Sequence, residues 1–359
     1  MAAIPNSKEK ELLFKTIGDL KTILIILVVL IHCYITSISK SGEIIYINRA
    51  TYPVFWYVST FLSNILASVA VPTFFLFSGF LFFYNISFFN YEAYKKKIKR
   101  RLKTLFVPYV CWNLIALGFL TIGGLLIPSM LPEKIKSITN WSIIDWLGVF
   151  WNFRGDGTPA DYPLWFIRDL LVVVLFTPII FVFIKKVKIA FIIILTIIWI
   201  LYYDVHITGF SRTALYFFTI GAYCGIRKLN FVNNVSRLSS NRFLIFILLI
   251  LYVVSTIAIL RFSFIYNCDY IRNMNVLLGI FLLICFYTLV IQRFDVCLPL
   301  ILKESTFFIY AAHGILLKPI QSLLQISMGD ISETKLFVIY GLKLGGGNSN
   351  MYSIVLYHK

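Results

Sequence analysis

Charged residues are scarce in this sequence, and acidic residues are scarcer than basic ones. Only 14% of the 359 residues are charged, with 16 acidic against 33 basic residues, while 59% are hydrophobic. Because soluble domains carry about a quarter of their residues as charges, this shortage excludes an ordinary soluble protein. The formal net charge of +17 does not indicate nucleic-acid binding, because that function needs a basic face on a soluble domain.

Clusters of cysteine and histidine are missing as well. The six cysteines form neither a CxxC pair nor a group with histidine, so we expect no disulfide framework and no metal site. They are Cys33, Cys111, Cys224, Cys268, Cys285 and Cys297. Alternating strands of about ten residues are also absent, which favours helical membrane spans over a closed barrel.

What the sequence does contain is a series of long apolar runs. A window analysis places them at 22–38, 60–84, 104–127, 164–184, 189–203, 211–226, 243–260, 275–292, 306–326 and 336–356. The sequence therefore predicts an all-α polytopic membrane protein, a bundle of about ten transmembrane helices in a single domain over residues 1–359. Since no small-residue cleavage site follows the first run, we expect it to be retained as a helix.

The basic residues are distributed unevenly between the connections. Twenty of the 33 lie in the N-terminal segment and in every second connection after it, most densely in KKKIKRRLK at 95–103. The positive-inside rule then places the N-terminus in the cytoplasm, and with ten spans the C-terminus too. The longest connection, 128–163, is expected on the outer side. We expect a multi-pass protein of a bacterial cytoplasmic membrane, with the lipid bilayer as its surroundings.

A histidine stands inside the first apolar run. In DLKTILIILVVLIHC, His32 follows Lys21 by eleven residues, which is about three helical turns, ~16 Å of rise and nearly the same face. An ionisable residue within a membrane span is by default a functional candidate, and an imidazole can act as general base or carry an acyl group. The alternative is a histidine hydrogen-bonded within the bundle and a lysine that reaches the membrane interface.

Further polar residues enter the apolar helices near their ends. Lys97, Arg100, Arg101 and Lys103 enter the third run, where they either fix orientation or hold phosphates at the inner mouth of a cavity. PLWFIRDLL carries Arg168 and Asp169, which either pair with other helices or hydrogen-bond a polar acceptor such as a sugar.

Two more candidates come from the second and ninth runs. Ser78 and Gly79 in VPTFFLFSGFLFF put a small polar step in an aromatic wall, which permits either close helix packing or ligand access. His313 in STFFIYAAHGILL lies about as deep in its helix as His32. The sequence does not show whether the two histidines meet.

Taken in order, six motifs resemble the membrane proteins of acyltransferase family 3. They are DLKTILIILVVLIHC, VPTFFLFSGFLFF, the basic run leading to LFVPYVCW, PLWFIRDL, TALYFFTIGAYCG and STFFIYAAHGILL, and together they cover about residues 15–326. The resemblance implies an acyltransferase of polysaccharide O-acetyltransferase type. The resemblance further implies acetyl-CoA or another acyl-CoA as the donor substrate, no bound cofactor, and a carbohydrate acceptor across the membrane.

The resemblance also implies roles for single residues. His32 matches the essential histidine of the first helix, Lys21 stands where an arginine is usual, and Ser78-Gly79-Phe80 resembles the SGF signature. Arg101 fits the first of two paired arginines, while the second falls on Thr104 unless the pair is Arg100 and Lys103. His313 matches a histidine of the ninth helix. The C-terminal segment KLFVIYGLKLGGGNSN departs from the expected pattern.

These features predict a membrane acyltransferase that moves an acetyl or similar acyl group to a hydroxyl of a surface polysaccharide. His32 is the candidate catalytic residue, Lys21, Arg100, Arg101 and Lys103 the candidate acyl-CoA phosphate ligands, and Ser78, Arg168, Asp169 and His313 the candidate acceptor or pore-lining residues. A transporter that exports a polysaccharide or lipid-linked sugar is the alternative, since the same polar pore would serve it. A structural scaffold explains the hydrophobicity but not the two histidines.

Overall fold

Helices make up nearly all of the chain that the structure describes. The computed structural model describes residues 7–40, 43–86, 88–126, 138–201, 209–262, 268–294, 298–327 and 331–357. Within these ranges the single sheet is a hairpin in which β1 (Ser37–Lys40) pairs antiparallel with β2 (Glu43–Tyr46). The all-α membrane fold expected from the sequence is therefore confirmed.

The helical elements follow one another through the whole chain. The first half contains α1 (Ser7–Cys33), α2 (Pro53–Ser59), η1 (Thr60–Leu66), η2 (Ala67–Val69), α3 (Ala70–Tyr84), α4 (Tyr91–Arg101), η3 (Leu102–Phe106), α5 (Val107–Leu126), η5 (Ile138–Asn140), α7 (Ile143–Leu147), η6 (Tyr162–Leu164) and α8 (Trp165–Leu175). The second half contains α9 (Thr177–Val187), α10 (Ile189–Leu201), α11 (Arg212–Ile226), α12 (Phe231–Ser239), α13 (Arg242–Phe262), α14 (Asp269–Phe294), α15 (Leu300–Ser327) and α16 (Glu333–Tyr357).

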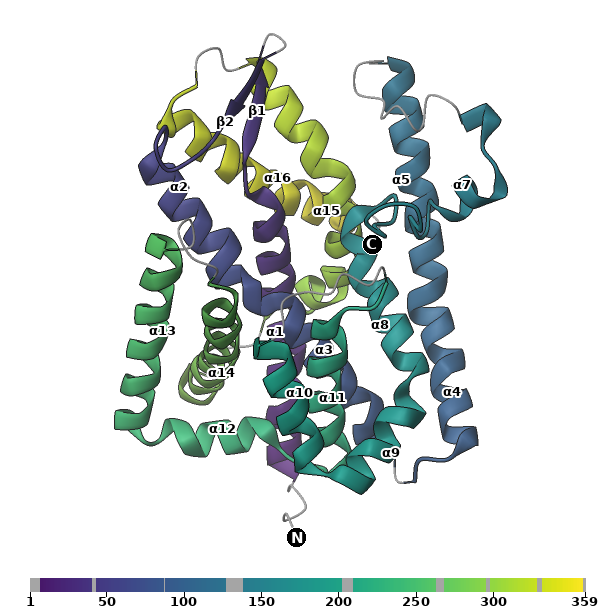
Figure 1. The fold of residues 1–359 in the computed structure, drawn as a ribbon, viewed down its shortest axis with the longest axis vertical. Coiled ribbons are helices and arrows are strands. Elements are labelled where there is room, and N and C mark those ends of the chain that lie inside the picture. Colours follow the sequence, from purple (N-terminus) through teal and green to yellow (C-terminus); the bar gives the residue numbers. More distant parts are fainter. Residues whose placement is uncertain are drawn as a thin grey trace.

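Helix α1 lies at the centre of the bundle, with the other helices arranged around it (Figure 1). It packs against α3, α14, α15 and α16, and Leu20, Leu24 and Val29 have no exposed surface. A helix that is apolar on every side is buried in a core or a membrane. The C-terminal end of α1, which carries His32, is therefore surrounded by several other elements.

Six helices among the described residues are long and apolar enough to cross a membrane, and a seventh results if α8 and α9 are counted as one bent span. The count of about ten expected from apolar runs is larger because a run need not form a long helix. Helix α10 has 13 residues and α11 has 15, so each rises only about 20 Å, less than the ~30 Å of a bilayer core.

Two helical segments differ from a straight span. Helices α8 and α9 meet at a bend of 60°, where Pro178 in the first turn of α9 lacks the N–H that would continue α8. The basic run at 95–103 lies within the helical stretch Tyr91–Gly123. This stretch begins with α4, whose N-cap is Asn90; the Asn90 side chain accepts from the N–H of Ala93 at 2.9 Å. Short α12 crosses the lower end of the bundle (Figure 1).

Helices α3 and α11 approach each other closely because glycines line their contact. A Cβ atom on Gly79 would lie 2.0 Å from the carbonyl oxygen of Phe218, and one on Gly221 would lie 1.9 Å from that of Leu76. Small residues allow such backbone contacts between membrane helices. Gly79, which the sequence singles out within its SGF motif, is therefore needed for packing.

Replacing Gly79 by alanine is expected to destabilise the fold, because the new methyl group would collide with a backbone oxygen that cannot move alone. Overpacking of this kind costs about 1–3 kcal/mol. The measurement is the thermal unfolding midpoint of the purified protein in detergent. Gly18→Ala is the matched control, since nothing lies within 4 Å of the added Cβ; equal midpoints for the two variants would contradict the close contact.

Candidate functional site

The helices that carry the two candidate histidines, α1 and α15, lie side by side. The buried carboxylate of Asp19 on α1 forms an ion pair with Lys303 on α15. One turn further along, the hydroxyls of Thr22 and Thr306 are 3.3 Å apart. These contacts fix the register of the two helices.

In this register the rings of His32 and His313 meet. Their centroids are 5.1 Å apart and their planes are tilted by 37°. Two residues that are 281 positions apart in the sequence thus form one pair in the interior of the bundle. The sequence predicted that the two histidines lie at similar depth. The structure adds that their rings are in direct contact, which the sequence could not show.

The backbone around His313 determines which of its nitrogens carries a proton. Nδ1 lies 2.5 Å from the carbonyl oxygen of Tyr310, and because a carbonyl only accepts, Nδ1 is the donor. In the neutral ring Nε2 is then an unprotonated acceptor. His313 is fully buried, and its Nε2 has no hydrogen-bond partner among the described residues. The pair therefore contains an acceptor nitrogen that no described residue satisfies.

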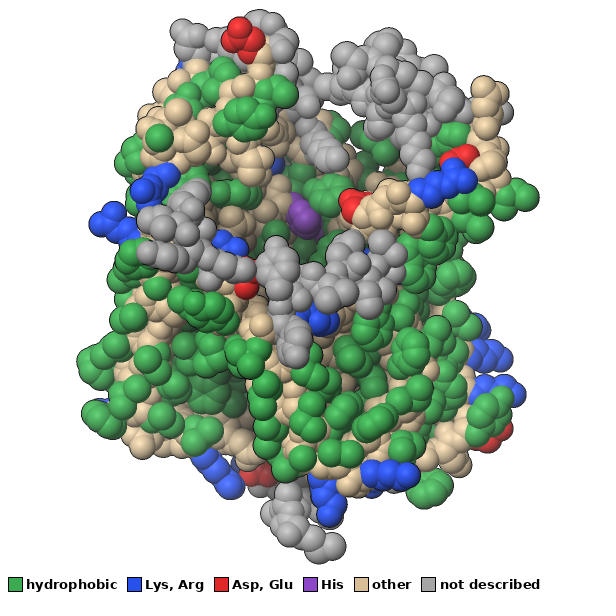
Figure 2. Space-filling view, in the orientation of Figure 1, with side chains coloured by type: hydrophobic (Ala, Val, Ile, Leu, Met, Phe, Trp, Pro, Cys, Tyr) green, Lys and Arg blue, Asp and Glu red, His purple; other side chains and the backbone are tan. Residues whose placement is uncertain are grey.

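Of the two histidines, His32 is the accessible one. It is half-buried, whereas His313 has no exposed surface. Figure 2 shows a histidine at the floor of a hollow between the upper helices, and His32 is the histidine of the described residues that can be seen from outside. A molecule entering the hollow meets His32 first, with His313 behind it.

Two residues that the sequence analysis did not single out stand next to His32. The ring of Tyr162 packs edge-on against the His32 ring, with centroids 5.0 Å apart. Lys343 on α16 is 2% exposed, donates to Oε1 of Gln321 at 2.8 Å, and its positive charge acts on His32. Lys343 lies in the C-terminal segment that departs from the family pattern. The sequence feature that could have identified it as a candidate is a lysine within an apolar run.

A buried carboxyl, Asp161, stands beside this group. It is 1% exposed, and neither of its oxygens has a hydrogen-bond partner among the described residues. Its backbone N–H donates to Oδ1 of Asn113 at 3.0 Å. Its Oδ1 faces the backbone of Gly314, where an added Cβ would lie only 2.6 Å away. Burial raises the pKa of this carboxyl to about 8, so at neutral pH most of it is protonated and can donate a hydrogen bond.

Asp161 should make the stability of the protein depend on pH in an unusual direction. Between the ordinary pKa of 3.8 and about 8, the folded protein keeps a proton that the unfolded chain has released. The free energy of unfolding therefore falls as the pH rises through this window, by about 1.4 kcal/mol per pH unit.

Asp161→Asn removes this ionisation, so the variant is expected to be more stable than the parent at pH 8 and similar to it at pH 4. The measurement is the thermal unfolding midpoint of both proteins across this range. Parallel pH profiles for variant and parent would show that Asp161 is not held protonated by burial.

A second polar group consists of cations. The charges of Arg100, Arg101 and Lys228 all act on Lys97, and the charge of Arg101 acts on Lys21. Lys228 was not predicted as part of this cluster. Because these five positive charges repel one another, an anion bound among them would relieve the repulsion. The group is thus suited to phosphate.

The four residues predicted to bind phosphate are not equivalent in the structure. Lys21 and Arg101 are half-buried, whereas Arg100 and Lys103 are exposed. The hydroxyl of Thr104, where the family's second arginine would fall, donates to the carbonyl oxygen of Arg100 at 3.0 Å. Lys21 and Arg101 therefore form the inward-facing part of the cluster.

Arg168 and Asp169 pair with each other. The guanidinium donates through Nε and Nη2 to Oδ1 of Asp169, at 2.9 and 2.8 Å, and through Nη1 to the carbonyl oxygen of Gly157. It also lies over the ring of Trp151 at 5.3 Å. Both side chains are buried. The sequence left open a pairing with other helices, but these two residues pair with each other, and both also line a cavity.

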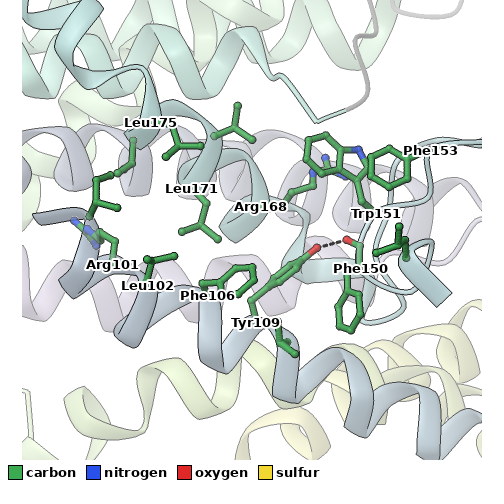
Figure 3. Close-up of a pocket in the computed structure, with 15 residues that line it drawn as sticks. Arg101, Leu102, Phe106, Tyr109, Phe150, Trp151, Phe153, Arg168, Leu171 and Leu175 are labelled. Carbon is green, nitrogen blue, oxygen red and sulfur yellow. Dashed lines mark hydrogen bonds between the residues drawn. The ribbon is translucent and has the colours of Figure 1, made fainter. Parts of the chain in front are cut away.

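An apolar crevice of about 560 Å³ separates α4 and α5 from α8. Figure 3 shows Arg101 and Leu102 at one end of it and Trp151 and Phe153 at the other, with Tyr109 donating to the carbonyl oxygen of Phe150. Its walls between these ends are leucine, valine and phenylalanine side chains. The crevice suits hydrocarbon, and His32 and His313 are not among the residues that line it.

Ser78 is half-buried on α3, and no hydrogen bond is found for its hydroxyl within the described part of the chain. Its neighbour Gly79 is explained by the contact with α11. The structure therefore groups His32 with His313 and Lys21 with Arg101, pairs Arg168 with Asp169, and leaves Ser78 outside these three groups.

The family model of acyltransferase family 3, described as an acyltransferase domain, matches residues 19–344. No curated protein and no solved structure matches the chain. The matched region includes α1 with both Lys21 and His32, the basic cluster, and α15 with His313. The chain belongs to acyltransferase family 3, whose members are membrane acyltransferases.

Proposed function

We propose that this protein transfers an acetyl or similar small acyl group from cytoplasmic acyl-CoA to a hydroxyl of a carbohydrate outside the membrane, in the manner of a surface polysaccharide O-acetyltransferase. The observation that carries the proposal is the pair of His32 and His313, in which an accessible imidazole stands in front of a buried acceptor nitrogen. Intramembrane histidines without a partner are costly unless they are used.

The proposed orientation places the cation cluster on the cytoplasmic side of a bacterial inner membrane. Lys and Arg side chains gather along the lower edge of the molecule, near the N-terminus (Figure 2). This distribution agrees with the positive-inside rule. The N-terminus then lies in the cytoplasm.

In this orientation the donor enters from the cytoplasmic end. The phosphates of CoA bind at Lys21 and Arg101, and its pantetheine arm carries the thioester toward His32. Because both residues of α1 lie on nearly the same face, about three turns apart, a single extended molecule can contact both. The acceptor approaches His32 through the hollow on the opposite side.

Two routes use the histidine pair, and both place His32 at the reacting atoms. In the first, a nitrogen of His32 attacks the thioester carbonyl, the C–S bond breaks, and CoA leaves as a thiolate that takes up the imidazolium proton. The acceptor oxygen then attacks the acyl-histidine, the C–N bond breaks, and the hydroxyl proton passes by way of Nε2 of His313 to the leaving nitrogen of His32, so that both rings end neutral. In the second, His32 takes the hydroxyl proton while the acceptor oxygen attacks the thioester carbonyl, the C–S bond breaks, and the departing CoA thiolate takes that proton from His32.

The test uses the purified full chain in proteoliposomes and radiolabelled acetyl-CoA. CoA should raise the thermal unfolding midpoint, because a ligand that binds the folded state stabilises it, and acetyl-CoA should release free thiol. A protein that exports a sugar needs no acyl donor. Absence of both CoA stabilisation and thiol release would favour such a transporter.

A further inference from the structure

A second cavity, of about 490 Å³, lies on the other side of α8 from the apolar crevice. The beginning of α3, the ends of α8, α10 and α14, and the segment 209–213 surround it. The side chains that give it its character are Trp165, Arg168, Asp169, Trp199, Thr213 and Asn273. Trp165 follows Tyr162 by one turn of helix, and Tyr162 contacts His32. One residue of the cavity wall is therefore about one helical turn from the tyrosine that touches His32.

An indole held rigidly in place forms part of the wall. Nε1 of Trp199 donates to Oγ1 of Thr213 at 3.1 Å. Its ring stacks on Tyr216 with centroids 5.1 Å apart and meets Phe217 edge-on at 5.0 Å. Trp165, which is half-buried, presents a second indole. Two aromatic surfaces of this kind suit a ligand with flat C–H faces, such as a sugar ring.

Polar groups with spare hydrogen-bonding capacity also line the cavity. Nδ2 of Asn273 donates to the carbonyl oxygens of Trp199 and Ile200 at 3.0 and 3.4 Å, which leaves its Oδ1 as an acceptor. The hydroxyl of Thr213 accepts from Trp199 and retains its own proton to donate. A ligand with several hydroxyls can satisfy both kinds of group.

The charge of the cavity argues against phosphate. Its charged groups are Arg168 and the carboxylates of Asp156 and Asp169. Hydrogen bonds from Thr158 hold the pKa of Asp156 below its usual range, so it stays ionised. Nε and Nη2 of Arg168 donate to Asp169, and Nη1 donates to the carbonyl oxygen of Gly157. With one engaged cation and two carboxylates, the cavity repels the CoA phosphates and admits a neutral polyol.

We propose that this cavity binds a sugar unit of the acceptor and presents one of its hydroxyls to His32. The inference rests on the proposed function, because it takes the acceptor to be a carbohydrate. The volume lies within the about 300–1,000 Å³ typical of small-molecule sites. Donor and acceptor thus occupy different places, with CoA at Lys21 and Arg101 and the sugar between the two indoles.

The experiment measures binding of methyl glucoside, methyl galactoside and N-acetylglucosamine to the purified full chain by quenching of tryptophan fluorescence. At least one sugar should bind saturably, and Trp165→Leu should weaken its binding about tenfold by removing an aromatic face. The matched control is Trp146→Leu, because Trp146 is 45% exposed and does not line the cavity. This control should bind like the parent.

The donor side is measured separately through CoA stabilisation, which Trp165→Leu should leave unchanged. Failure of all three sugars to bind, equal sugar affinity in Trp165→Leu and the parent, or competition between CoA and sugar for one site would overturn the cavity assignment. Loss of CoA binding in the parent would instead overturn the proposed function, while the sugar measurement keeps its meaning.

Discussion

Replacing His32 by alanine is expected to abolish acyl transfer while leaving the protein folded. The residue touches the reacting atoms in both chemical routes, and removing a general base alone lowers a rate by about 100-fold or more. The fold should survive, because the side chain is half-buried and its ring contacts are with Tyr162 and His313. The measurement is acetyl transfer from labelled acetyl-CoA, together with the unfolding midpoint and CoA stabilisation.

His313→Phe separates the pair from the single residue. Phenylalanine keeps a ring of similar size at the fully buried position but removes the acceptor Nε2. If that nitrogen receives the hydroxyl proton, transfer to the acceptor should slow while CoA binding stays unchanged. A His32→Ala variant that retains the parental rate would remove the catalytic assignment, and a fully active His313→Phe would reduce the site to His32 alone.

Neutralising the half-buried cations is expected to weaken donor binding strongly. Lys21→Met and Arg101→Met each remove a charged partner of a CoA phosphate, and a hydrogen bond to a charged group contributes about 1.5–3 kcal/mol. Each variant should therefore raise the KM for acetyl-CoA about 10- to 100-fold. The turnover number should change less, because both residues lie far from the thioester.

The matched control for this pair is Lys103→Met, which removes an exposed charge of the same helical stretch. Its KM should stay near the parental value, and a higher salt concentration should weaken CoA binding in the parent more than in Lys21→Met. A Lys103→Met variant as defective as Arg101→Met would place the phosphate ligands on the exposed face of the cluster instead.

Helix periodicity was enough to predict the parts of the site that lie on one element. Lys21 and His32 share α1, and eleven residues of α-helix place them on nearly the same face. The depth of His313 followed in the same way. Their meeting could not be predicted, because it depends on how α1 packs against α15, and the contacts that fix this register join residues 284 positions apart.

Residues missed by the sequence analysis are those whose role comes from their surroundings. Asp161 lies in a connection and looks like a turn residue, but burial leaves its carboxyl without a partner. Tyr162 and Trp199 look like ordinary interface aromatics until the fold puts them beside His32 and in the polar cavity. The span count exceeded the number of long helices because hydropathy does not reveal where α10 and α11 end.

The buried ion pair of Asp19 and Lys303 limits how the protein can open. Sliding α1 against α15 by one helical turn would move these charges apart by about 5.4 Å and strand a carboxylate that has no exposed surface, at a cost of several kcal/mol. The two helices that carry the histidines, α1 and α15, are therefore held in one fixed register. Any conformational change that widens the path to His32 must therefore come from the surrounding helices, while α1 and α15 keep their register.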